Sequence, residues 1–114
     1  MTTLLVCGSR SITDRKRVFD AIENTLAKHQ VDMILTGGAR GVDKIAMEYA
    51  MEKDIPRKAV LPDYPRYGRA APLIRDDEMV DQADIILAIW DGNSGGTGYT
   101  INSARKAGKP VILK

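Results

Sequence analysis

Short apolar runs alternate with amphipathic segments along the whole chain. The apolar runs predict five strands, at Leu4–Cys7, Met33–Thr36, Lys58–Leu61, Asp84–Trp90 and Val111–Leu113. Between them, apolar side chains recur every three or four residues, which predicts helices over Asp14–Lys28, Val42–Lys53, Leu73–Gln82 and a last segment that carries Ile101, Ala104 and Ala107 inward. Gly108 and Pro110 are typical of a helix end and stop this last segment.

The alternation of strands and helices indicates the fold class. Parallel strands need a crossover connection, usually a helix, and apolar runs without alternation are typical of strands buried on both faces. The sequence therefore predicts an α/β fold, with a five-stranded, mostly parallel sheet and helices on both faces. We expect a single Rossmann-like nucleotide-binding domain over residues 1–114.

Three glycine-rich clusters each follow a predicted strand and lead into a predicted helix. In such a sheet the carboxyl ends of the strands share one edge, so the clusters should converge there. Glycine lets the backbone approach an anion closely, and the free N–H groups at a helix start attract negative charge, although any one such turn can be glycine-rich without a ligand. We predict that a phosphate-bearing ligand is bound by these clusters and their neighbours: Gly8, Ser9, Arg10, Gly37, Gly38, Ala39, Arg40, Gly41, Asp43, Arg75, Asp76, Trp90, Asp91, Gly92, Ser94, Gly95, Gly96 and Thr97.

Four motifs taken together resemble the SLOG superfamily. They are "GSR" from Gly8, "GGARGVD" from Gly37, "RDDEM" from Arg75 and "WDGNSGGT" from Trp90. This superfamily groups the Smf/DprA DNA-processing proteins with the LOG phosphoribohydrolases, and the chain is most similar to its short stand-alone YspA/YpsA-related branch. The resemblance implies a Rossmann-like domain that binds, and in some branches cleaves, nucleotides or nucleotide-derived signals such as ADP-ribose relatives. It also implies a homodimer or a higher homo-oligomer.

The LOG hydrolases, which this chain resembles, carry an Arg-Lys-x-x-Met helix and a Pro-Gly-Gly-x-Gly-Thr-x-x-Glu turn. The arginine and the glutamate of these motifs help to break the N-glycosidic bond of a nucleoside monophosphate. Arg75 and Met79 match this pattern. Its lysine, proline and threonine are replaced by Asp76, Ser94 and Tyr99. The glutamate becomes Asn102 or Thr100, depending on how the glycines are aligned, and neither residue supplies a carboxylate. Because glycosidic cleavage needs acid, base or charge stabilisation, this change argues against hydrolysis by the LOG route.

Several acids and one aromatic residue have two interpretations each. Asp43 would complement the dipole of the second helix, or bind a ribose hydroxyl as the family's GGxxGxD motif implies. Asp91 suits either a ligand contact or an Asx turn, and Trp90 suits either stacking on a base or core packing. If the protein is an enzyme, the candidate catalytic residues are Arg75, Asp43, Asp76 and Asp91.

The loop over residues 62–72, the single histidine and the single cysteine are weaker candidates for the site. Residues 62–72 read as a loop with three prolines, and Tyr64, Tyr67 and the neighbouring arginines suit a lid over the ligand. His29 is the only histidine and is expected at the surface, which excludes a histidine triad, and we expect no metal site and no cofactor. Cys7 is expected to be a small buried apolar residue.

Composition narrows the function classes further. The chain has 114 residues, 44% of them apolar, and a net charge of +2. The single cysteine and the absence of a long apolar stretch predict a cytoplasmic protein without a membrane partner. The small net charge and the few aromatic residues argue against nucleic acid as a partner. We therefore expect a sensor or sequestering module for a small-molecule nucleotide, with a phosphoribohydrolase as the alternative and a single-stranded DNA binder as the third possibility.

Overall fold

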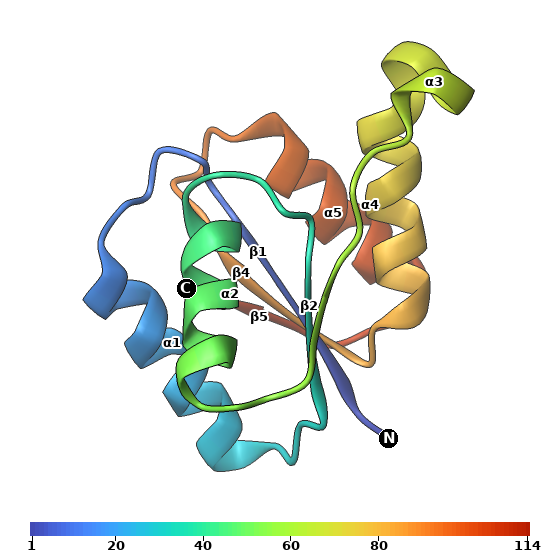
Figure 1. Ribbon diagram of the computed structural model, residues 1–114. Helices are drawn as coiled ribbons and strands as arrows, with labels where there is room; N and C mark the ends of the chain where they lie inside the picture. Colours follow the sequence, from blue (N-terminus) through green and yellow to red (C-terminus); the bar gives the residue numbers. More distant parts are fainter.

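Five parallel strands form the central sheet of the molecule (Figure 1). The computed structural model describes residues 1–114. The strands follow the order β3-β2-β1-β4-β5, and their bounds are β1 Thr3–Gly8, β2 Met33–Thr36, β3 Arg57–Ala59, β4 Ile85–Ile89 and β5 Val111–Leu113. The chain builds one half of the sheet from β1 to β3 and then returns to the other side of β1, so the strand order reverses between β1 and β4. The predicted α/β fold is confirmed, and the sheet is entirely parallel.

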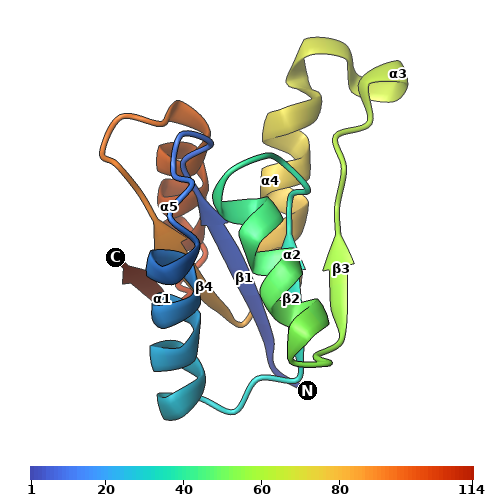
Figure 2. The ribbon, with the colours of Figure 1, turned by 60° about the vertical axis from the view of Figure 1, so that its left-hand side comes forward.

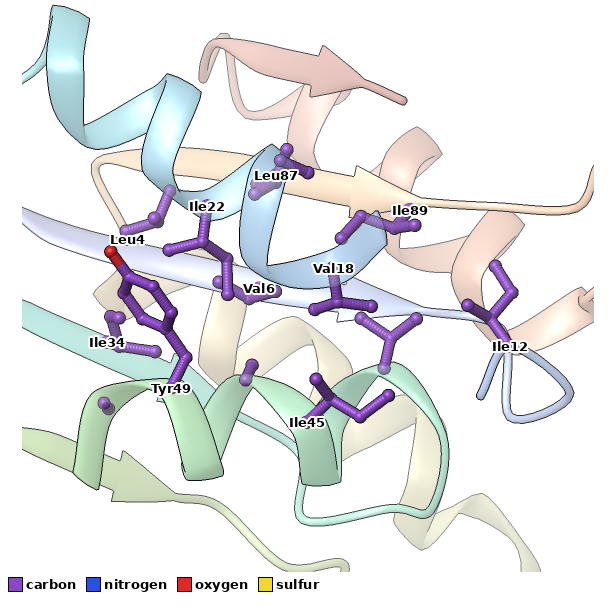
Figure 3. Close-up of a cluster of buried hydrophobic side chains, with 14 of the residues drawn as sticks. Leu4, Val6, Ile12, Val18, Ile22, Ile34, Ile45, Tyr49, Leu87 and Ile89 are labelled. Carbon is purple, nitrogen blue, oxygen red and sulfur yellow. The ribbon is translucent and has the colours of Figure 1, made fainter. Parts of the chain in front are cut away.

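Four long helices cover the two faces of this sheet (Figure 2). The helices α1 (Arg15–Lys28) and α2 (Val42–Glu52) pack on one face, and α4 (Ala71–Gln82) and α5 (Gly95–Lys106) pack on the other. Successive side chains of a strand point to opposite faces. Leu4 and Val6 of β1 therefore join the cluster with α1 and α2 shown in Figure 3, whereas Leu5 and Cys7 join the cluster with α4 and α5. None of the helices has the length and apolar character required to cross a membrane.

Three sequence predictions about the elements were wrong in detail. The predicted loop over residues 62–72 contains a short helix α3 (Tyr64–Tyr67) and a 3-10 turn (Gly68–Ala70), because the Asp63 carboxylate accepts a hydrogen bond from the Arg66 N–H at 3.2 Å and caps α3. The third strand is an exposed edge strand of three residues, so nothing buries both of its faces. Ala107 is exposed, because it is the C-cap of α5 and lies past its apolar stripe.

A lysine from the last connection closes the carboxyl end of α4. The Lys109 ammonium donates to three backbone carbonyls, at 2.7 Å to Val80, 2.8 Å to Asp81 and 2.7 Å to Ala83. These carbonyls lie at the end of a helix, where they have few intrahelical partners and carry partial negative charge. One charged side chain therefore ties the segment before β5 to the end of α4.

We expect Lys109→Met to lower the free energy of unfolding by about 2 kcal/mol, because a hydrogen bond to a charged group contributes about 1.5 to 3 kcal/mol and methionine retains the length of the side chain. Urea denaturation of both proteins measures this difference. Lys106→Met serves as a control, since Lys106 is exposed and in the last turn of α5. An equal loss of stability in both variants would contradict the role assigned to Lys109.

Candidate functional site

A pocket of about 800 Å³ opens at the carboxyl edge of the sheet. It lies where the strand order reverses, which is the usual ligand position in open parallel sheets. The turns after β1, β2 and β4 all contribute to its wall, so the three glycine clusters converge. Most of the residues predicted to bind the ligand line this pocket: Gly8, Ser9, Arg10, Gly37, Gly38, Ala39, Arg40, Asp43, Arg75, Asp76, Asp91, Ser94, Gly95, Gly96 and Thr97.

The turn after β4 presents the start of α5 to the pocket. Gly95 and Gly96 were expected in the turn before the last helix, but they form the first turn of α5. Ser94 makes no capping hydrogen bond with its side chain, and the N–H groups of Gly95, Gly96 and Thr97 donate to no acceptor in the protein. A Cβ on either glycine would meet no atom within 4 Å. The N–H groups of the first turn of this twelve-residue helix are therefore free, whereas the N–H of the N-cap Ser94 donates to the Asp91 carboxylate at 3.0 Å.

The turn after β1 is held in place by hydrogen bonds to the end of β4 and the residues that follow it. Ser9 is buried, its N–H donates to the Ile89 carbonyl at 3.1 Å, and its hydroxyl accepts from the Asp91 N–H at 3.0 Å. Arg10 follows at the exposed rim of the pocket. Gly41 packs against the backbone of Arg10, where a Cβ would lie 2.6 Å from the Arg10 carbonyl oxygen, and its φ is +75°. Gly41 therefore allows two loops to touch and lies outside the pocket lining.

The turn after β2 forms the pocket floor together with Arg75 of α4. The Arg75 Nη1 donates to the Gly37 carbonyl at 2.6 Å and to the Val60 carbonyl at 3.2 Å, while Nε pairs with the Asp76 carboxylate at 2.9 Å. A Cβ on Gly37 would lie 2.8 Å from Arg75 Nη1 and 3.0 Å from Asp43 Oδ2, so glycine is needed for this approach. Arg75 thus braces two loops against α4, a role that the sequence did not reveal.

Two buried carboxylates flank this arginine. Asp43 accepts from the Ala39 N–H at 3.2 Å, and burial raises the pKa of its carboxyl to about 6, although the Ala39 N–H and the Arg75 charge act in the opposite direction. Burial also raises the pKa of Asp76, against the opposing effect of Arg75. Cys7 lines the same floor, and burial, reinforced by both carboxylates, raises the pKa of its thiol. The floor therefore holds groups whose charge depends on their surroundings.

Asp91 and Trp90 make structural contacts within the turn before α5. The Asp91 carboxylate accepts from the N–H groups of Asn93 and Ser94 at 2.8 and 3.0 Å, which is the Asx-turn interpretation, and these bonds lower its pKa. The Trp90 Nε1 donates to the Ser94 carbonyl at 3.0 Å, and its ring lies 3.3 Å from the Cβ position of Gly98. Trp90 and Gly92 do not line the pocket. Trp90 therefore fixes the loop before α5 through its hydrogen bond to Ser94 and does not face the pocket.

Several residues that line the pocket were not predicted to bind the ligand. Two positions were candidates for the glutamate of the LOG pattern. Thr100 lines the pocket, whereas Asn102 is exposed on α5 and does not. The candidate position that faces the pocket therefore carries a hydroxyl and not a carboxylate. The Thr100 hydroxyl donates to the Gly96 carbonyl at 3.1 Å. Helical spacing from Gly96 could have identified it, since residues four apart share a face. Met79 and Asn93 also line the pocket and lie within two of the quoted motifs, but they were not predicted to bind the ligand. No motif marked the other lining residues that were missed, Ser11, Leu61, Pro62, Pro72 and Leu73.

Residues 2–67 match the family described as the YspA, cpYpsA-related SLOG family. This stretch is more than half of the chain and contains the first two glycine clusters of the pocket. The chain belongs to this SLOG family. The Gene 61 protein of Mycobacterium phage D29 is 37% identical to this SLOG chain over an alignment of 119 positions that covers 98% of the chain and 95% of the relative. The resemblance to the SLOG superfamily is thereby confirmed.

Three solved structures share the fold of this SLOG protein. TM1055, a structural genomics target, has a TM-score of 0.74 and 24% identity to this chain, and the match covers 98% of this chain and 73% of the TM1055 chain. DNA processing protein A from Streptococcus pneumoniae matches 99% of the chain with a TM-score of 0.79 and 17% identity, and its Helicobacter pylori counterpart matches 98% with 0.76 and 22%. The chain spans 50% and 64% of these two proteins. At these identities the likeness shows the fold alone.

The prediction that argued against nucleic acid as a partner was wrong. The Helicobacter pylori protein has the same fold as this SLOG chain, and its structure is described by its single-stranded DNA binding mode. Net charge and aromatic content are averages over the whole chain, whereas binding depends on the local surface. A small net charge therefore does not exclude nucleic acid for this fold.

Proposed function

We propose that this protein binds a nucleotide or a nucleotide-derived small molecule, such as an ADP-ribose relative, as a sensor or sequestering module. The binding unit is a single nucleotide-binding domain over residues 1–114, and the ligand phosphate lies at the start of α5. The observation that carries the proposal is the bare first turn of α5 inside a pocket formed by three glycine clusters. N–H groups that point into open space from the positive end of a helix are suited to a phosphate.

The charges around the pocket support an anionic ligand at its rim. Arg10 and Arg40 are exposed, line the pocket and form no ion pair, so both are free to pair with phosphate oxygens. The acidic groups of the floor, Asp43 and Asp76, lie below them beside Arg75. An anion is therefore attracted to Arg10 and Arg40 and to the free N–H groups of α5, while the Asp91 carboxylate is the one exposed acidic group that lines the pocket.

Binding is favoured over cleavage because α5 lacks the glutamate of the LOG pattern. The pocket-facing position where the LOG pattern has a glutamate is Thr100, whose hydroxyl already donates to the helix backbone. Asp91 is exposed and accepts from the backbone of its own turn, which leaves Asp43 and Asp76 as the carboxylates of the floor. Asp76 is paired with Arg75. We accordingly expect very slow or no release of free base from a nucleoside monophosphate.

Titration with adenosine 5'-monophosphate, ADP-ribose and adenosine tests the proposal. The two phosphorylated compounds should raise the free energy of unfolding by about 2.7 kcal/mol at a hundred times their Kd, because they bind only the folded state. Adenosine should give a much smaller effect at equal concentration. Equal stabilisation by adenosine would contradict the phosphate site, and stabilisation by none of the three would contradict the function. Chromatography of the incubated mixtures would detect any cleavage.

A single-stranded DNA end is the second candidate ligand. It is favoured by the fold shared with the DNA processing protein A structures, one of which is described by its single-stranded DNA binding. The same free N–H groups would then hold a phosphate of the strand. Competition between a short 5'-phosphorylated oligonucleotide and adenosine 5'-monophosphate would support this candidate. Lack of competition would exclude DNA from the site and favour the small-molecule ligand.

A further inference from the structure

The wall of the pocket opposite α5 is apolar and exposed. The protein exposes six large apolar side chains, and three of them line this one pocket: Leu61, Tyr64 and Leu73, which are 66%, 56% and 43% exposed. Pro62 and Pro72 complete the wall. Single exposed apolar residues are ordinary, but a group of them around a cleft indicates a surface that becomes covered. We define these five residues as the apolar wall.

The apolar wall is continuous with the turn after β2. The Leu61 Cδ2 atom lies 2.6 Å from the position that a Cβ on Gly38 would take, so its side chain covers this glycine. Figure 2 shows the segment from β3 to α3, which carries part of the wall, on one side of the sheet and the loop between β4 and α5 on the other. In the strand order, three steps separate β3 from β4, which is about 14 Å at the usual strand spacing. One extended ligand could therefore contact both the wall and α5.

We propose that the apolar wall holds the flat heteroaromatic ring of the ligand while the start of α5 holds its phosphate. The inference rests on the proposed function and assigns the ring of its nucleotide ligand to a defined surface of the pocket. A pocket of about 800 Å³ is far larger than a phosphate group requires and falls in the range of sites for whole small molecules. Tyr64 supplies an aromatic face for stacking, and Leu61 and Leu73 supply apolar contact.

The wall residues have no other covering partner in the protein. Tyr64 makes no hydrogen bond with its side chain and belongs to α3, none of whose residues are buried. Leu61 lies in the connection between β3 and α3, and Leu73 lies in the first turn of α4. Truncating these side chains should therefore affect ligand contact far more than folding.

Comparison of adenosine 5'-monophosphate with ribose 5-phosphate tests the inference. Wild-type protein should bind the first about a hundredfold more tightly. In Leu61→Ser/Leu73→Ser, the affinity for adenosine 5'-monophosphate should fall about tenfold or more, while the affinity for ribose 5-phosphate stays within twofold. Tyr64→Ser should behave in the same way, and Tyr64→Phe should bind like wild type, because the ring face and not the hydroxyl makes the contact.

Leu113→Ser is the matched control, since Leu113 is 50% exposed on β5 and does not line the pocket. It should leave both affinities unchanged. Equal binding of the two probes by wild-type protein would overturn the apolar wall as a ring site and leave the proposed function intact. Failure of both probes to bind would overturn the proposed function, and the ring site with it. Equal loss of both affinities in Leu61→Ser/Leu73→Ser would also overturn the ring site.

Discussion

A Gly96→Val variant is expected to bind adenosine 5'-monophosphate at least a hundredfold more weakly than wild type and to remain folded. Gly96 is the second residue of α5, and its N–H is among those that donate to no acceptor. A Cβ there meets nothing within 4 Å, and Gly96 is not among the glycines with positive φ, so a larger side chain strains neither packing nor backbone. The valine methyl groups would instead fill the space from which a phosphate reaches the helix.

Asn102→Val is the control for this experiment, because Asn102 is exposed on the same helix and outside the pocket. Calorimetric titration measures both affinities, and urea denaturation checks that each variant is folded. Undiminished binding by a folded Gly96→Val protein would show that the start of α5 is not the phosphate site. Gly38→Val is a poorer test, since Gly38 has a φ of +70° and its Cβ position lies 2.6 Å from Leu61, so the substitution also strains the fold.

The sheet and the convergence of the glycine clusters could be predicted because both follow from local patterns. The predicted bounds of two strands, Met33–Thr36 and Val111–Leu113, agree with the structure, and those of β1 and β4 differ from it by one residue at each end. Once the strands are parallel, their carboxyl ends share one edge whatever the strand order is. The clusters after Cys7, Thr36 and Ile89 therefore had to meet, and the sequence alone was sufficient to infer this.

The contacts that shape the pocket floor could not be predicted, because they join residues far apart in the sequence. Arg75 looks like a phosphate ligand in a motif, yet it donates to the carbonyls of Gly37 and Val60, 38 and 15 residues away. Gly41 belongs to a phosphate-type motif, yet it is required for the contact with the Arg10 backbone. A motif specifies which residue types are present, whereas their partners depend on how the loops pack.

Two residues of the apolar wall, Leu61 and Leu73, were missed for a related reason. Leu61 was assigned to a strand and Leu73 to a helix, and apolar residues in such elements are expected to face the core. The strand β3 ends at Ala59, so Leu61 lies beyond it and is exposed. Exposure of an apolar side chain depends on where an element ends, and element ends are the features that sequence patterns define least well.

Asp43 should make the protein less stable as the pH rises from about 4 to 7. Its carboxyl is buried, and its pKa is raised from the ordinary value of 3.8 to about 6. The folded state therefore binds the proton more tightly than the unfolded state. The stability from this proton is fully present below pH 3.8 and is lost as the pH rises through about 6. The difference between the two pKa values corresponds to about 3 kcal/mol.

In Asp43→Asn, this fall in stability should be absent, because asparagine does not titrate and its carbonyl can still accept the hydrogen bond from the Ala39 N–H. Urea denaturation of both proteins from pH 4 to 8 measures the difference in slope. Asp91→Asn is the matched control: backbone hydrogen bonds lower the pKa of Asp91 from its ordinary value of 3.8, so its titration lies below the range scanned, and its stability profile from pH 4 to 8 should run parallel to that of wild type. Parallel profiles for wild type and Asp43→Asn would mean that Asp43 is solvated in solution. A difference confined to pH 4–7 would instead identify a carboxylate that weakens the fold at neutral pH, as expected of a group retained for binding rather than for stability.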